Sequence, residues 1–234
     1  GVMSLTGQPG GPPTRVGTSI GDLAAGLFAL SGIGAALYHR ERTGETQKLD
    51  IAMLDCQVAL LENAIARYVA TGKAPGPLGA RHPSITPFGA FAAADHPIII
   101  AAGNNQLFER LCAAIEAPWI VKDARFATNE ERVIHRQALT EALGPIMRAR
   151  TTAAWIAALE AADVPCGPIN TLDQVYADPH VIARGAVETA KRQDGTTMQL
   201  AVNPARMSAT PPSTRRAPPP RRHRYRAIGH ARPK

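Results

Sequence analysis

The sequence has few of the features that identify the common enzyme classes. Aromatic residues make up 5% of the chain. Its three cysteines, Cys56, Cys112 and Cys166, are widely spaced and form no CxxC pair, which argues against a disulfide scaffold or a zinc site. No GxGxxG, Walker, HExxH or GxSxG motif occurs. We therefore predict no metal site, and the cysteine usage fits a reducing, cytoplasmic location.

Acidic residues are absent from the last 24 positions. Residues 211–234 hold eight of the 26 Lys and Arg residues and no Asp or Glu, so residues 1–210 carry 18 basic and 19 acidic residues. The net charge of +7 therefore belongs to a basic tail, which we expect to be disordered, and binding of nucleic acid is not predicted. No uninterrupted apolar run reaches the roughly 18 residues of a membrane span, and no signal peptide opens the chain. We expect a soluble protein without a membrane partner.

Helical and strand-like segments alternate along the chain, which predicts the α/β or α+β class. Helices are expected over 23–40 and 53–70, after an N-cap at Asn104, from a capping box at Thr128 to Gly144-Pro145, which should kink or end the helix, from Thr152, and over 172–177. Strands are expected over 48–52, and as two hairpins: 88–92 with 98–102 around Asp95-His96-Pro97, and 187–191 with 198–202 around Asp194-Gly195. A Pro- and Gly-rich linker covers 73–87, and Val164–Pro168 reads as a rigid turn.

Asp22 lies at the start of the first long apolar helix. The usual role of such an Asp is an N-cap. The alternative is a carboxylate nucleophile that attacks an acyl-CoA carbonyl, passes through a mixed anhydride and holds coenzyme A as an aspartyl thioester. Gly21 would let a bulky thioester approach the backbone. Cys112 and Cys166 are expected to be structural.

Several ordered motifs give the chain a resemblance to a known family. They are Met3-Ser4-Leu5-Thr6-Gly7, Ile20-Gly21-Asp22, Ala25-Gly26, Arg40-Glu41-Arg42-Thr43-Gly44 with Gln47, Asp50-Ile51-Ala52-Met53-Leu54-Asp55, Arg81-His82-Pro83-Ser84-Ile85, Asp123-Ala124-Arg125-Phe126 with Asn129 and Arg132, and Val164-Pro165-Cys166-Gly167-Pro168. From about residue 1 to about residue 218 the chain resembles the family III CoA-transferases of the CaiB/BaiF type, which include formyl-CoA and oxalate CoA-transferases.

The resemblance implies a fold and a nucleophile. Asp22 matches the family's catalytic Asp. Family members have a Rossmann-like large domain built from both ends of the chain, a small α+β domain from its middle, and two interlocked subunits. The implied plan is a nucleophile-bearing part of the large domain over 1–75, a linker over 76–85, the small domain over 86–162, and a return to the large domain over 163–210. The family's N-terminal half has no counterpart here, so we expect the C-terminal portion of a longer chain with an incomplete large domain, and CoA-binding residues remain unknown.

The function implied is transfer of coenzyme A between carboxylic acids, with small acids such as oxalate or formate as substrates and a homodimer as the assembly. Coenzyme A is then a substrate, and no cofactor is expected. Arg67, His82 and Asn104 are further candidates for contacts to the acyl group. Two alternatives stay open: an α-methylacyl-CoA racemase-like enzyme with Asp22 as a base, and a catalytically silent fragment or interaction module.

Overall fold

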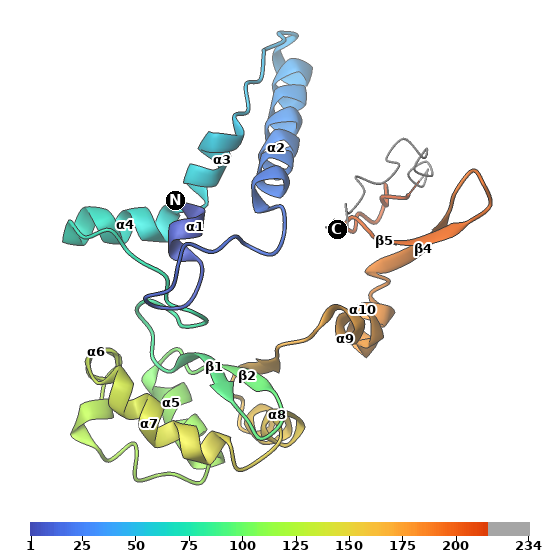
Figure 1. Ribbon diagram of the computed structural model, residues 1–234. Helices are drawn as coiled ribbons and strands as arrows, with labels where there is room; N and C mark the ends of the chain where they lie inside the picture. Colours follow the sequence, from blue (N-terminus) through green and yellow to red (C-terminus); the bar gives the residue numbers. More distant parts are fainter. Residues whose placement is uncertain (215–234) are drawn as a thin grey trace, which may run out of the picture. The chain divides into compact units, whose positions relative to one another are not determined.

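The computed structural model describes residues 1–214 of the 234-residue chain, so most of the predicted basic tail lies outside the described residues. The chain divides into two compact units, Gly1–Pro168 and Ile169–Lys234, and each is considered by itself. Helices and small antiparallel sheets occur together (Figure 1), which confirms the predicted mixed α/β class.

Helices make up the N-terminal part of the first unit. They are α1 (Val2–Leu5), α2 (Ile20–Thr43), α3 (Met53–Ala59) and α4 (Glu62–Thr71). The helices α2 and α3 lie side by side (Figure 1), with Ala24 and Cys56 as their buried side chains. Gly44 ends α2 in the left-handed conformation, with φ of 76°, and its N–H bonds to the carbonyl of Arg40.

Two predictions for this region were wrong. Residues 48–52 form no regular secondary structure and join no sheet among the described residues; instead Leu49 and Ile51 pack against Gly32 of α2. The single helix expected over 53–70 is broken at Leu60 and Leu61 into α3 and α4. Its predicted apolar face, including Val58 and Val69, is exposed, so no buried surface holds the two segments in one straight helix.

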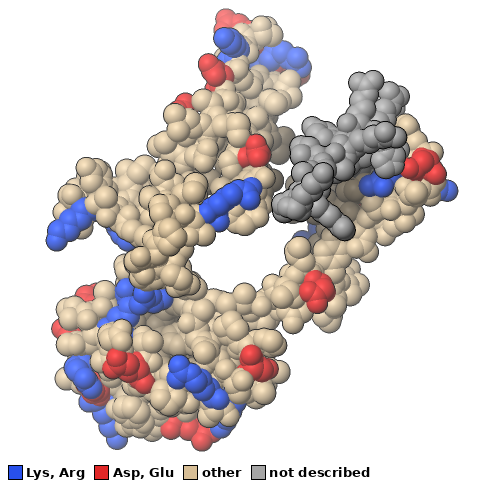
Figure 2. All heavy atoms as spheres, viewed as in Figure 1, with Lys and Arg blue, Asp and Glu red and all other residues tan. Residues whose placement is uncertain are grey.

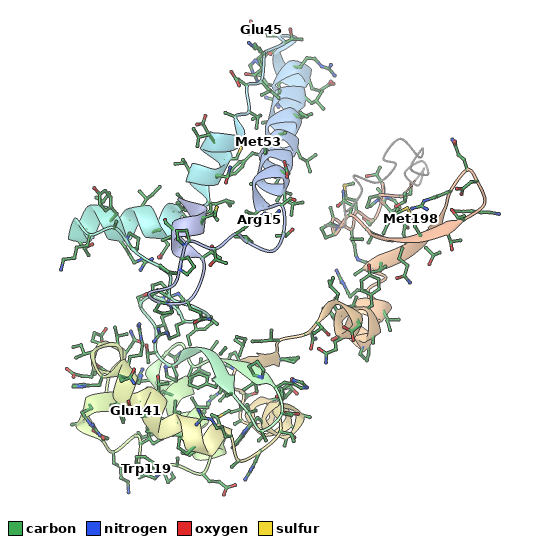
Figure 3. The ribbon with its side chains drawn as sticks, viewed as in Figure 1. Arg15, Glu45, Met53, Trp119, Glu141 and Met198 are labelled. Carbon is green, nitrogen blue, oxygen red and sulfur yellow. The ribbon has the colours of Figure 1, made fainter. Side chains whose placement is uncertain are left out.

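The helix α2 is apolar yet almost wholly exposed. Its large apolar side chains are exposed, among them Leu27 at 67%. Figure 2 shows charged side chains mainly at the C-terminal end of α2, where Figure 3 labels Glu45. By length and composition α2 is long and apolar enough to cross a membrane, a property that it shares with core helices of soluble proteins.

The central α/β body, residues 81–168, is built on a three-stranded antiparallel sheet in the order β1-β2-β3. The strands are β1 (Phe88–Ala92), β2 (Pro97–Ala101) and β3 (Cys166–Pro168). The predicted hairpin is confirmed, with Gly89 opposite Ile100. The segment predicted as a rigid turn instead adds β3 to the sheet, with Cys166 opposite Ile100.

Helices pack against this sheet around one core. They are α5 (Asn105–Ala114), the 3₁₀ turn η1 (Ala124–Phe126), α6 (Asn129–Ile134), α7 (Arg136–Met147) and α8 (Thr152–Ala161). The predicted caps are confirmed: the Asn104 side chain accepts from the Leu107 N–H at 2.8 Å, and Thr128 accepts from the Glu131 N–H. The helix expected from Thr128 is interrupted at His135, and α7 continues past Pro145 rather than ending there.

The sheet and the helices of this body share one hydrophobic core. Ile98 and Ile100 of β2 meet side chains of α5, α7 and α8, among them Trp155, whose indole N–H donates to the Met147 carbonyl at 2.7 Å. Cys112 is fully buried here, and burial raises the pKa of its thiol to about 12, which confirms its structural role. Burial also raises the pKa of Cys166.

The second unit contains two short helices and a hairpin. They are α9 (Leu172–Ala177), α10 (Pro179–Ala183), β4 (Val187–Lys191) and β5 (Thr197–Ala201). The predicted helix over 172–177 and the predicted hairpin are both confirmed, and the hairpin pairs Val187 with Ala201.

Candidate functional site

Asp22 lies in the first turn of α2 and not at its cap. The helix begins at Ile20, and its N-cap residue is Ser19, which makes no side-chain capping bond. The interpretation of Asp22 as an N-cap is therefore wrong, because the helix starts earlier than the apolar pattern predicted. Within the described part of the chain, the Asp22 carboxylate makes no hydrogen bond or ion pair, and the residue is exposed. A negative charge in the first turn of a 24-residue helix interacts favourably with the helix dipole.

A cavity of about 260 Å³ opens beside Asp22. Its walls are formed by the first turn of α2, the loop before α2, α1 and α3. The lining residues are Val2, Met3, Arg15, Val16, Thr18, Ser19, Ile20, Gly21, Asp22 and Gln57. Arg15 lies in the loop that leads into α2 (Figure 3). The cavity thus combines one exposed carboxylate, one guanidinium, one amide and two hydroxyl groups with four apolar side chains.

Gly21 lets the amide of Gln57 reach this cavity. A Cβ atom at position 21 would lie 3.2 Å from Nε2 and 3.3 Å from Cδ of Gln57, tighter than ordinary van der Waals contact. The absence of a side chain at position 21 therefore brings α3 and its Gln57 side chain against the first turn of α2. Reasoning from the sequence gave Gly21 a different purpose, space for a thioester, and did not identify Gln57 or Arg15.

The other candidates from the sequence do not line this cavity. The Asn104 side chain caps α5, a local structural role. The imidazole of His82 stacks on Phe88 with ring centroids 5.1 Å apart, and its Nδ1 accepts from the Ser84 N–H. Arg67 lies on α4, where its Nε is buried without a hydrogen-bond partner among the described residues. Of the candidate side chains, Asp22 is the one that lines this cavity, and its carboxylate has no hydrogen-bond partner within residues 1–214.

The fold and this cavity define a class: an α/β protein with an exposed carboxylate at a helix start beside a small-molecule site. Comparison with protein families then matches residues 1–224 to CoA-transferase family III. The chain belongs to this family.

Curated relatives of this chain are also CoA-transferases. The chain is 43% identical over 185 residues to an acetyl-CoA:oxalate CoA-transferase of Acetobacter aceti, which covers 79% of this chain and 48% of the relative. It is 38% identical over 211 residues to a succinate–glutarate CoA-transferase of Agrobacterium fabrum, and this match covers 90% of this chain and 53% of the relative. The chain therefore spans about half the length of these curated relatives.

Solved structures match as well. A CaiB/BaiF family protein from Brucella suis has 37% identity and a TM-score of 0.72, covering 90% of this chain and 54% of its own. Rv3272 from Mycobacterium tuberculosis has 26% identity and a TM-score of 0.81, and the match covers 94% of this chain and 58% of Rv3272. The unmatched 6% of this chain is shorter than α2, so the shared fold includes at least part of this apolar helix.

Proposed function

We propose that this chain carries the nucleophile of an enzyme that transfers coenzyme A between carboxylic acids, and that the nucleophile is Asp22. The observation that supports this role is the free, exposed carboxylate at the start of α2 beside a cavity of about 260 Å³. A carboxylate that is not already held by a hydrogen bond or an ion pair keeps its oxygen lone pairs for attack on an electrophile.

The reaction proceeds by two exchanges at Asp22. A carboxylate oxygen of Asp22 attacks the thioester carbonyl of the donor and expels the CoA thiolate, which leaves a mixed anhydride. The thiolate attacks the aspartyl carbonyl, releases the donor acid and forms an aspartyl-CoA thioester. The acceptor carboxylate then attacks this thioester, and the released thiolate completes transfer to the acceptor carbonyl, so that free Asp22 is restored.

Arg15 and Gln57 fit two tasks in this sequence. The Arg15 guanidinium provides a positive charge for the incoming carboxylate, and a guanidinium binds a carboxylate through paired hydrogen bonds. The Gln57 amide can donate to the oxygen that gains negative charge as the carbonyl is attacked. Both side chains line the cavity of Asp22.

For the substrates, we propose small acids of the oxalate type. The relative from A. aceti is named for acetyl-CoA and oxalate, and the relative from A. fabrum for succinate and glutarate. We also propose a cytoplasmic homodimer; the exposed apolar side chains of α2, such as Leu23 and Leu27, support an assembly that covers them.

A chimera tests the proposal, because the chain spans only about half of its relatives. This chain replaces the matching region of the A. aceti relative, and conversion of acetyl-CoA and oxalate into oxalyl-CoA and acetate is measured. We expect Asp22→Asn to lower kcat by at least about 10³-fold, as loss of a covalent nucleophile does. Asp55→Asn is the matched control, because Asp55 lies in the first turn of α3.

The same chimera separates a racemase from a transferase. A racemase exchanges the α-hydrogen of a 2-methylacyl-CoA with deuterium from solvent and needs no acceptor acid, whereas a transferase makes product only when an acceptor is present. Hydrogen exchange that depends on Asp22, without CoA transfer, would contradict the proposal. Retention of more than about a tenth of the turnover in Asp22→Asn would contradict the role of Asp22.

A further inference from the structure

Two arginines of the central α/β body donate hydrogen bonds to the segment that precedes β1, and a third lies next to this segment in the chain. Arg132 donates from Nε to the Thr86 carbonyl at 2.8 Å. Arg136 donates from Nε to the Thr86 hydroxyl at 3.1 Å and from Nη2 to the Pro83 carbonyl at 3.2 Å. Arg81 precedes this segment. In residues 1–214 none of the three forms an ion pair with an Asp or Glu.

The three arginines differ in how far their hydrogen bonds are satisfied. Arg132 is fully buried, and its other nitrogens donate to the Phe126 carbonyl and the Asn105 side chain, so it is a structural element. Arg81 is exposed, and among the described residues its side chain donates only from Nε, to the Leu78 carbonyl at 3.3 Å, which leaves both of its Nη groups without a partner there. Arg136 is half-buried, with Nη1 available; burial and the nearby Arg81 charge lower its pKa.

Arg81 and Arg136 both line a cavity of about 50 Å³ between β1 and α7. The rest of its wall is largely apolar: Ile85, Thr86, Pro87, Phe88, Gly89, Ala90, Phe91, Leu139, Thr140 and Leu143. One water molecule needs about 10–15 Å³ of such space, so the cavity holds a few small groups and nothing of nucleotide size.

We propose that this cavity binds a small organic carboxylate, with the carboxyl group between Arg81 and Arg136 and a short alkyl chain against the apolar wall. Two guanidinium groups that line one cavity, with no acidic partner in residues 1–214, favour an anion, and guanidinium groups match the planar carboxylate. The apolar lining selects against inorganic phosphate, whose remaining oxygens would lose water without gaining donors. No lining residue is shared with the cavity of Asp22.

The test is a titration of the 234-residue chain with sodium propionate at constant ionic strength, followed by ¹H–¹⁵N NMR. We expect saturable shifts confined to residues 81–91 and 136–143, with a dissociation constant on the order of millimolar, as befits partly exposed charges. Propionamide has the same shape without the charge, and inorganic phosphate has charge without the alkyl chain, so neither should produce these shifts.

Arg81→Gln is the decisive variant, because the exposed side chain makes a single hydrogen bond among the described residues. We expect it to weaken propionate binding by about tenfold, the effect of losing a charge-assisted hydrogen bond. Arg148→Gln removes the same charge from another exposed position and should change affinity less than about twofold. In thermal unfolding, propionate should raise the Tm of the unaltered chain and of Arg148→Gln, but not of Arg81→Gln.

Three results would overturn the proposal: no saturable shift up to about 50 mM propionate, equal binding of phosphate or propionamide, or an unchanged affinity in Arg81→Gln. None of these measurements uses CoA transfer. The proposed carboxylate site and the proposed role of Asp22 are therefore tested independently of each other.

Discussion

The amide of Gln57 on α3 lies directly against Gly21 on α2, with Nε2 3.2 Å from the place that a Cβ at position 21 would occupy. This contact joins the two helices at the residue before Asp22. The glycine therefore has a packing role in addition to any role in admitting substrate, and the two residues form a pair whose energetic coupling can be measured.

Alanine at position 21 should stabilise the chain only when Gln57 is shortened. In a helix, Gly→Ala contributes up to about 1 kcal/mol of stability. With Gln57 present, the new methyl group presses on the amide and cancels this gain. A double-mutant cycle of Gly21→Ala and Gln57→Ala in urea denaturation measures the coupling, which we expect to be about 0.5–1 kcal/mol. Additive effects of the two substitutions would contradict the contact.

Arg132 should be far more important for stability than any exposed arginine. Its guanidinium is fully buried and donates to Thr86, Phe126 and Asn105. Arg132→Gln leaves buried carbonyls without donors and should lower the free energy of unfolding by at least about 3 kcal/mol. Arg148→Gln, at an exposed position, should leave the free energy of unfolding nearly unchanged. Equal effects of the two substitutions on the denaturation midpoint would contradict the assigned role.

Protonation of Asp95 should lower the free energy of unfolding in acid. Hydrogen bonds from the Thr152 and His96 backbone N–H groups lower the pKa of its carboxyl from 3.8 to about 2. Because the folded-state pKa is the lower one, the stabilisation is fully present above pH 4 and is lost as the pH falls from about 4 toward 2. Unfolding free energies measured across this range should fall less steeply in Asp95→Asn.

The control for Asp95 is Asp50→Asn. It removes the same charge from an exposed position without a hydrogen bond among the described residues. In this variant the free energy of unfolding should fall with pH as steeply as in the unaltered chain. An equally steep loss of stability in Asp95→Asn would show that other carboxyl groups cause the effect.

Local chemistry in the sequence predicted many elements of the fold. Asn104 and Thr128 were identified as caps because their side chains accept hydrogen bonds from the N–H groups that a helix start leaves free. The hairpins followed from apolar runs around Asp95-His96-Pro97 and Asp194-Gly195. The pattern failed where pairing is distant in sequence: Cys166 joins the sheet beside Ile100, which nothing local to Val164–Pro168 indicates.

The site was predictable only in part. Asp22 was identified through the Ile20-Gly21-Asp22 motif, and its role as nucleophile stays a prediction. Arg15 and Gln57 were missed because they come from a loop and a different helix, and only the folded chain brings them to one cavity. The break at Leu60 was missed because periodicity records which side chains share a face, and not whether that face is covered.

The 234-residue chain by itself should show no steady CoA transfer. The CoA-transferases it resembles are about twice as long, and α2 exposes a large apolar surface here. Positioning a thioester for attack can account for about 7–11 kcal/mol of a barrier, so a site without all of its CoA contacts loses most of its rate. Calorimetry with CoA and a turnover assay check this; micromolar affinity with steady turnover would contradict it.

Trapping the covalent intermediate tests the central claim most directly. The chimera with the A. aceti relative is incubated with acetyl-CoA and then with hydroxylamine, which converts an aspartyl thioester to a hydroxamate, and tryptic peptides are analysed by mass spectrometry. The account predicts a hydroxamate at Asp22, in the peptide that runs from Val16 to Arg40, and its loss in Asp22→Asn but not in Asp55→Asn. Turnover without this label, or a label at another carboxylate that persists in Asp22→Asn, would contradict the account.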